Sequence, residues 1–64
     1  MENTLKATRI AAGMTQEELS KKSGVSRTII SGLENETIKS VTTDTIIAIA
    51  RALGVLPSKI FFLG

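Results

Sequence analysis

The apolar residues of this 64-residue chain fall into short stretches with helical spacing, separated by glycines and polar residues. Gly13, Gly24 and Gly54 each follow such a stretch, at the position where a left-handed C-terminal cap favours glycine. The pattern therefore predicts a series of short helices. We place them at residues 4–12, 16–23, 27 to 34 or 35, 43–53 and 57–62, with a loop over residues 36–41.

Residues suited to helix N-termini support these boundaries. Thr15 and Glu18 have the T-x-x-E spacing of a capping box, in which each side chain accepts a hydrogen bond from the other residue's backbone N–H. Pro57 suits the first position of the last helix, although Leu56 before it is a poor N-cap. Suitable N-caps also precede the first, third and fourth helices: Asn3 or Thr4, Ser26, and Thr42.

The composition favours a small all-α domain with an aliphatic core. Sixty-four residues allow one domain, residues 1–64, and 42% of them are hydrophobic while only 3% are aromatic. The fourth helix is expected to be central because it is the most apolar, through Ile46, Ile47, Ile49, Ala50 and Leu53.

The residues that the chain lacks argue against several function classes. Without cysteine or histidine there is no thiolate nucleophile, no usual zinc site and no side chain that titrates near neutral pH. We therefore expect no enzyme activity, no metal or other cofactor and no small-molecule ligand. No apolar run approaches the roughly 20 residues of a membrane span, and the first twelve residues carry charges where a signal peptide is apolar. A soluble, cytoplasmic protein is expected.

The charge is mildly basic and unevenly distributed. The net charge is +2, and residues 1–32 contribute all of it, with five basic and three acidic side chains. Any basic surface should therefore be built mainly by the first half of the chain.

The second and third helices, joined by Gly24-Val25-Ser26, have the layout of a helix-turn-helix. Leu19 is expected to face inward and Ser20 to lie where the helices cross, while Val25, Ile30 and Leu33 close the pair. A helix-turn-helix places its second helix in the major groove of DNA, with the first lying across the backbone. The alternative for this segment alone is an ordinary helical hairpin.

Four groups of residues stand in the order and spacing of one family. They are Leu5 and Arg9 ahead of Gly13-Met14-Thr15-Gln16-Glu17-Glu18-Leu19, then Gly24-Val25-Ser26, Ile30-Ser31-Gly32-Leu33-Glu34-Asn35, and Ile49-Ala50-Arg51-Ala52-Leu53-Gly54-Val55. Through them residues 4–63 resemble the phage-repressor and Cro-like helix-turn-helix family, the XRE family. The resemblance implies a lambda-repressor-like bundle of five helices and a transcriptional regulator that binds its DNA operator as a dimer.

The polar face of the third helix is expected to read DNA bases. Arg27, Thr28, Ser31 and Gly32 lie opposite Ile30 and Leu33, and Arg27 can pair with guanine O6 and N7 or merely reach a phosphate. Gly32 either admits the DNA closely or avoids a clash between helices. Ile29 is ambiguous between a groove contact and partial burial.

Other polar residues are expected to contact the DNA backbone. Gln16, at the N-terminus of the second helix, is expected to bind a phosphate; its alternative is full solvation. The resemblance implies the same role for Thr37 and Lys39, whose alternative is a solvated loop. Ser26 and Asn35 complete this set of predicted backbone contacts.

The resemblance also implies an ion pair between Arg9 and Glu34. At several other positions the chain departs from the family pattern. Ser20 and Ser23 replace alanine and an apolar residue, so the second helix is expected to pack less firmly. Glu36 replaces the frequent glycine after Asn35.

The C-terminal end is expected to form a dimer interface. Ile60 to Leu63 are four consecutive apolar residues in a short helix, which cannot bury all of them in its own core. We expect Leu56, Pro57, Phe62 and Leu63 to pair two copies on a palindromic double-stranded DNA operator, as a repressor would. The alternative is a protein-interaction module of the same fold, similar to an antitoxin or antirepressor, that binds little DNA.

Overall fold

A computed structural model describes residues 2–62 of the chain, and the side chains of residues 3–61. The predicted all-α fold is confirmed, and the second and fourth helices have the predicted boundaries. The helices are α1 (Leu5–Ala11), α2 (Gln16–Ser23), α3 (Arg27–Glu34), α4 (Thr43–Leu53) and α5 (Pro57–Ile60). Two-residue strands, β1 (Glu2–Asn3) and β2 (Phe61–Phe62), were not predicted.

The predicted glycines and N-caps mark the helix ends. Gly13, Gly24 and Gly54 have φ values of 72°, 76° and 71°. Thr15 and Glu18 form the reciprocal capping box, and Ser26 and Thr42 cap α3 and α4. At α1 the N-cap position is Thr4, but the Thr4 side chain makes no capping bond. The Leu5 N–H instead donates to Asn3 Oδ1 at 3.1 Å.

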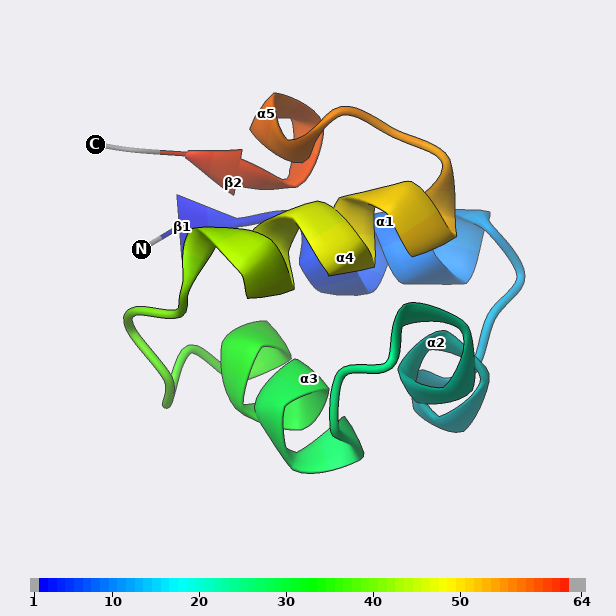
Figure 1. The fold of residues 1–64 in the computed structure, drawn as a ribbon, viewed down its shortest axis with the longest axis horizontal. Coiled ribbons are helices and arrows are strands. Elements are labelled where there is room, and N and C mark those ends of the chain that lie inside the picture. Colours follow the sequence, from blue (N-terminus) through cyan, green and yellow to red (C-terminus); the bar gives the residue numbers. More distant parts are fainter. Residues whose placement is uncertain (1, 63–64) are drawn as a thin grey trace.

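Every helix contributes at least one fully buried side chain to a single core. These are Leu5, Leu19, Ile30, Leu33, Ile49 and Ile60, from α1 to α5 in order. Figure 1 shows α4 crossing in front of α1, with α2 and α3 below them and α5 above. This packing leaves one side of the α2–α3 pair on the outside of the molecule.

The buried face of α4 is narrower than its apolar composition suggests. Ile49, Ala50 and Ala52 are buried, whereas Ile47 is 39% exposed. Ile46 and Leu53 are only half-buried. In a helix with apolar residues on several sides, the neighbouring helices decide which side is covered.

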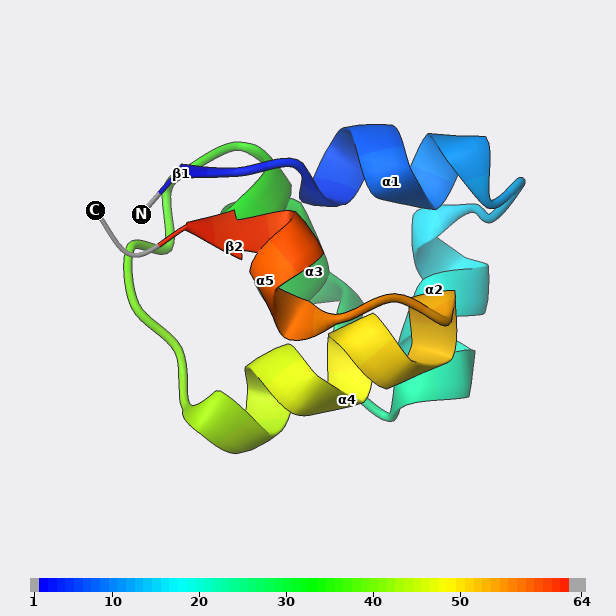
Figure 2. The same ribbon diagram turned by 90° about the horizontal axis from the view of Figure 1, so that it is seen from above.

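The predicted final helix, residues 57–62, is wrong at its C-terminal end. The helix ends at Ile60, and Phe61 adopts an extended backbone with φ −112° and ψ 129°. Phe61 then pairs with Asn3, and Phe62 with Glu2, in the antiparallel ladder of β1 and β2, which lie side by side in Figure 2. Pairing with residues almost 60 positions away overrides the local helical pattern. Among residues 2–62, no helix has the length and apolar character needed to cross a membrane.

Candidate nucleic-acid interface

The turn between α2 and α3 is fixed by the serines that we expected to loosen the packing. Ser20 Oγ donates to the Val25 carbonyl at 2.6 Å, and the Val25 N–H donates to Ser23 Oγ at 3.1 Å. Leu19 beside them is fully buried. The two hydroxyls therefore bond the turn between α2 and α3, and looser packing of α2 stays a prediction.

Helix α3 has one apolar face and one polar face, as predicted. Ile30 and Leu33 are fully buried, whereas Arg27 and Thr28 are exposed and Ser31 is half-buried. Gly32, which was predicted to share the polar face, is buried. Ile29 is half-buried and packs against the core, so its ambiguity is settled as partial burial.

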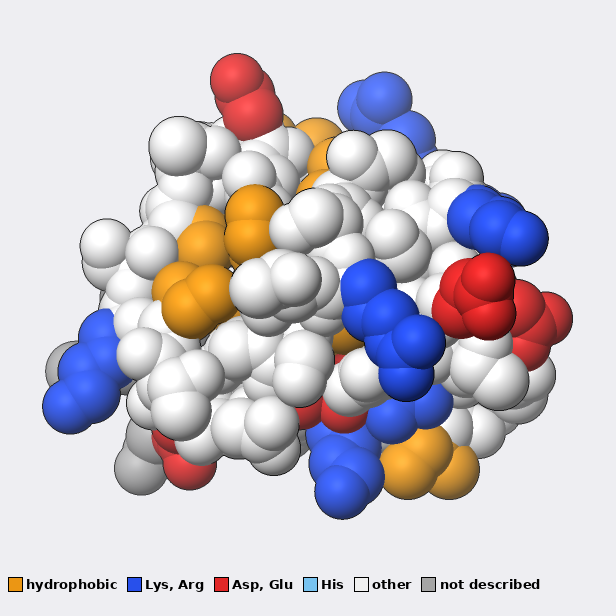
Figure 3. All heavy atoms as spheres, turned by 90° about the horizontal axis from the view of Figure 1, so that it is seen from below, with side chains coloured by type: hydrophobic (Ala, Val, Ile, Leu, Met, Phe, Trp, Pro, Cys, Tyr) orange, Lys and Arg blue, Asp and Glu red, His pale blue; other side chains and the backbone are white. Residues whose placement is uncertain are grey.

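The polar face of α3 borders a surface hollow of about 460 Å³. Figure 3 views the molecule from the side on which α2 and α3 lie, with a basic side chain near the middle of the face and acidic side chains mostly at its rim. The hollow brings together all four predicted base-reading residues and two of the predicted phosphate contacts. Its lining is Gln16, Arg27, Thr28, Ser31, Gly32 and Thr37.

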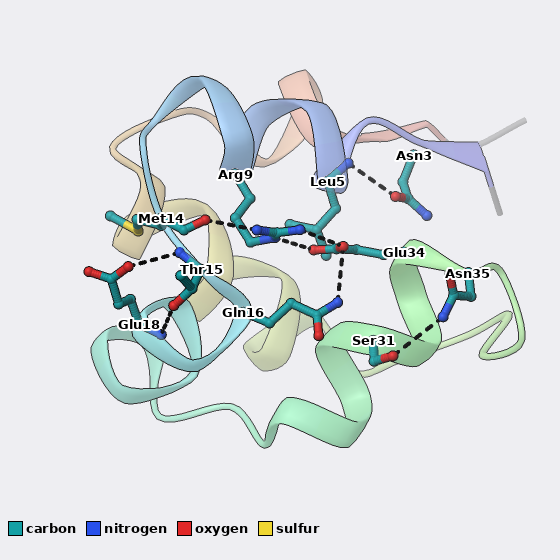
Figure 4. Close-up of polar contacts among 10 residues, drawn as sticks. All are labelled: Asn3, Leu5, Arg9, Met14, Thr15, Gln16, Glu18, Ser31, Glu34 and Asn35. Carbon is teal, nitrogen blue, oxygen red and sulfur yellow. Dashed lines mark hydrogen bonds and ion pairs between the residues drawn. The ribbon is translucent and has the colours of Figure 1, made fainter.

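A buried ion pair lies behind this surface, at the positions that the resemblance implied. Arg9 Nε donates to Glu34 Oε2 at 2.7 Å and Arg9 Nη2 donates to Glu34 Oε1 at 3.0 Å, so the pair is bidentate (Figure 4). The two side chains are only 12% and 2% exposed. Arg9 Nη1 also donates to the Met14 carbonyl at 2.8 Å. The pair thus connects α1, the α1–α2 turn and the C-terminal end of α3.

The partners of Glu34 determine its ionisation. Burial alone would raise the pKa of the Glu34 carboxyl, but hydrogen bonds from Arg9 and Gln16 and the charges of Arg9 and Lys6 outweigh burial and lower it. The hydrogen bond to Glu34 raises the pKa of Arg9. Both groups are therefore charged at neutral pH.

Gln16 belongs to the same network. Its Nε2 donates to Glu34 Oε1 at 3.1 Å, and the side chain is half-buried at the edge of the hollow. The alternative of a fully solvated glutamine is therefore wrong. A primary amide nitrogen carries two hydrogens, so one N–H remains for a ligand beside α2.

The structure gives Gly32 an internal role. Glycine costs about 1 kcal/mol relative to alanine inside a helix. Here a Cβ on Gly32 would lie 2.5 Å from Ile38 Cδ1 and 2.6 Å from Ile38 Cγ1. The clash that glycine avoids is with the α3–α4 loop rather than with another helix, and a direct base contact by Gly32 stays a prediction.

Of the remaining predicted backbone contacts, Thr37 lines the hollow, whereas Ser26, Asn35 and Lys39 do not. Ser26 Oγ accepts the Ile29 N–H at 3.2 Å as the α3 cap, and Asn35 Nδ2 donates to Ser31 Oγ at 3.3 Å. Thr37 lines the hollow, and Lys39 is exposed two residues further along the loop.

Two residues that support this surface were not identified from the sequence. Ile38 fills the space over Gly32, and its signal was an apolar residue in a mostly polar loop, close to a glycine inside a helix. Asn3 donates from Nδ2 to the Leu33 carbonyl at 3.0 Å, across 30 positions. That contact had no signal in the sequence, because it depends on how the N-terminal strand packs.

Comparison with known proteins identifies the family. A family model described as helix-turn-helix matches residues 5–60, which span all five helices. Searches of curated proteins and of solved structures returned no match. The chain belongs to the helix-turn-helix family of DNA-binding regulators, of the XRE type.

Proposed function

We propose that the protein is a sequence-specific regulator of transcription, a repressor that occupies a palindromic double-stranded DNA operator as a dimer. The observation that carries this proposal is the outer face of α3. Its first turn presents Arg27 and Thr28 to solvent, while the opposite side is fully buried. The side chains with hydrogen-bonding capacity are therefore on the side of the helix that is free to enter a groove.

The geometry suits entry of α3 into the major groove with α2 lying across the backbone. An α-helix with its side chains is about 10–12 Å across, which fits the roughly 12 Å width of the B-DNA major groove. The exposed guanidinium of Arg27 can donate two hydrogen bonds to guanine O6 and N7, which is its proposed role. Thr28 and Ser31 lie on the same face for a methyl contact or a single hydrogen bond.

Contacts at the two ends of the hollow are proposed to hold this helix in register. The amide of Gln16 lies at the N-terminus of α2, beside backbone N–H groups that attract phosphate. Thr37 and Lys39 follow the C-terminal end of α3 in the chain. Phosphate contacts on both sides fix position without carrying sequence information, which leaves the choice of sequence to α3.

Selection of bound duplexes from a random pool tests the proposal. The expected result is a palindromic consensus whose half-sites are about one helical turn apart, enriched by the native chain and lost with Arg27→Ala. Lys22→Ala, an exposed change on α2, is the matched control and should return the same consensus.

The same experiment separates the alternative function. A protein-interaction module similar to an antitoxin would enrich no consensus, and its residual duplex binding would show only the salt dependence of non-specific binding. Repression follows if the consensus overlaps promoters and the native chain lowers transcription from them.

A further inference from the structure

Three hydrogen bonds from the loop after α3 converge on one carbonyl of that helix. The Gly32 carbonyl accepts the Thr37 N–H at 2.9 Å, the Ile38 N–H at 3.1 Å and the Thr37 hydroxyl at 3.3 Å. These bonds turn the chain back toward the exposed face of α3, so that Thr37 lines the same hollow as Arg27.

A side-chain contact accompanies those bonds. Ile38 is half-buried, packs against the core, and occupies the space directly over the Cα of Gly32. Gly32 is not among the residues with positive φ, so its backbone does not require glycine. The need is for space: an added Cβ would lie 2.5 Å from Ile38 Cδ1, well inside ordinary contact distance.

We propose that Gly32 is a positioning residue for DNA binding: its missing side chain makes the notch that holds Ile38, and this contact sets Thr37 and Lys39 beside α3 for phosphate contact. The inference rests on the proposed DNA-binding function. It explains why a poor helix former stands in the last turn of the recognition helix. A side chain at position 32 would force Ile38 outward and take the loop with it.

Three variants separate this role from a direct base contact. Gly32→Ala fills the notch while Ile38 is present. Ile38→Ala empties the notch but leaves the bonds to the Gly32 carbonyl. The double variant replaces the Ile38 side chain by the new methyl. The two contacts at 2.5 and 2.6 Å disappear, and the contact with the Cβ of residue 38, at 3.4 Å, is an ordinary one.

The first measurement is amide hydrogen exchange at Thr37 and Ile38 in the free protein. Gly32→Ala should speed exchange at both amides about tenfold or more, while the double variant should exchange as slowly as the native chain. The proposed contact between Gly32 and Ile38 would be wrong if the two amides exchanged as slowly in Gly32→Ala as in the native chain. It would also be wrong if they exchanged as fast in the double variant as in Gly32→Ala. Because no DNA is present, this result does not depend on the proposed function.

The second measurement is affinity for a non-operator duplex between about 50 and 200 mM salt. Each phosphate contact contributes about 0.9 to the slope by which log affinity falls with log salt concentration. After the loss of one contact, the fourfold increase in salt should therefore lower the affinity by a factor about 3.5-fold smaller. Gly32→Ala should lower the salt slope by this amount for each bound chain, and the double variant should keep the slope of the native chain. Lys39→Gln is the positive control, because it removes the contact without disturbing the exchange of Thr37.

The outcomes distinguish the two claims. If Gly32→Ala weakens only operator binding and leaves the salt slope unchanged, glycine faces the bases directly and the inference is wrong. An unchanged slope in Lys39→Gln also contradicts it, because the loop would then carry no phosphate contact through Lys39. If the native chain binds no duplex, the proposed function fails and so does the DNA half of this inference, whatever the exchange data show.

Discussion

Arg27 and Gln16 border the same hollow but are held differently by the fold. The Arg27 side chain is exposed and makes no hydrogen bond or ion pair with the side chains or backbone described for residues 3–61, whereas the Gln16 side chain is bonded to Glu34. A free guanidinium can reach into a groove and adapt to a base edge. An amide fixed by a buried carboxylate is better suited to a constant feature of DNA, the phosphate.

This difference predicts opposite effects on specificity. Arg27→Ala should weaken operator binding by about 1–3 kcal/mol, with a much smaller effect on non-operator duplex, because a base contact carries the sequence information. Gln16→Ala should weaken both about equally. Titrations against operator and scrambled duplex measure the ratio. If that ratio is the same in Arg27→Ala and the native chain, Arg27 does not read a base.

Glu34 is expected to be the most sensitive charged position for stability. Its side chain is 2% exposed, so Glu34→Ala leaves the Arg9 charge buried without its partner and should cost about 3 kcal/mol in the free energy of unfolding. Glu17→Ala is the control, because its 3.7 Å pair with Lys21 is exposed and worth at most about 1 kcal/mol. Urea denaturation measures both. A loss below about 0.5 kcal/mol for Glu34→Ala would mean that the pair contributes little.

The same carboxylate predicts a dependence of stability on pH. The folded-state pKa of Glu34 is lowered, so its contribution is fully present above the unfolded pKa, about 4.3, and is lost as pH falls through the folded value. The native chain should therefore lose stability below about pH 4.5, and Glu34→Gln should lack that part of the loss. Glu18 also has a lowered pKa, through its hydrogen bonds to Thr15, so both proteins retain some acid sensitivity. Identical pH profiles would contradict the prediction.

At the scale of the elements, α1 and α3 end with the same pattern of hydrogen bonds but different residues. After α1 the Gly13 N–H donates to Ile10 and the Met14 N–H to Arg9; after α3 the corresponding donors are Glu36 and Thr37. This is the Schellman motif, which needs one residue in the left-handed conformation. Gly13 meets that need without strain, whereas Glu36 adopts φ 59° with a full side chain.

Replacing that glutamate should stabilise α3. A residue with a Cβ pays about 1–2 kcal/mol in this conformation, and the greater freedom of glycine in the unfolded chain returns part of it. Glu36→Gly should therefore raise the free energy of unfolding by about 0.5–1 kcal/mol, which corresponds to an increase in Tm of several degrees. Glu36→Ala separates strain from charge, because it removes the carboxylate but keeps the Cβ. Equal stability of the glycine and alanine variants would show that strain is unimportant here.

The elements also show how far the sequence could predict this fold. Caps and glycines are local signals, and they predicted α2 and α4 to the residue. The end of α5 depended on a ladder between Phe61 and Asn3, and the arrangement around Gly32 depended on Ile38 folding back onto α3. Neither contact has a periodic pattern, so the sequence predicted which residues border the hollow but not what holds the loop there.

At the scale of the molecule, one chain offers DNA a single short helix. An α3 of eight residues spans only a few base pairs, and such a site occurs too often in a genome to be occupied selectively. Two copies related by a two-fold axis double the site and fix the half-site spacing. The C-terminal segment was expected to supply the pairing surface, but Ile60 and Phe61 are buried in the chain's own core. Of the predicted interface, Pro57 is half-buried, and the side chains of Phe62 and Leu63 lie outside the described residues.

Leu56, at 74% exposed, is therefore the described residue on which the predicted dimer most depends. Sedimentation with a labelled palindromic duplex should give two chains per duplex, bound cooperatively. Full burial of a leucine is worth about 1.5–3 kcal/mol, so Leu56→Ser should reduce the cooperativity about tenfold or more while leaving the affinity for a single half-site unchanged. Ile10→Ser is the matched control, because Ile10 is a 58% exposed apolar residue on α1, outside the predicted interface. One chain per duplex would rule out a contact between copies. Equal cooperativity in Leu56→Ser and Ile10→Ser would place that contact elsewhere, because only a pairing surface that includes Leu56 responds to Leu56→Ser and not to Ile10→Ser.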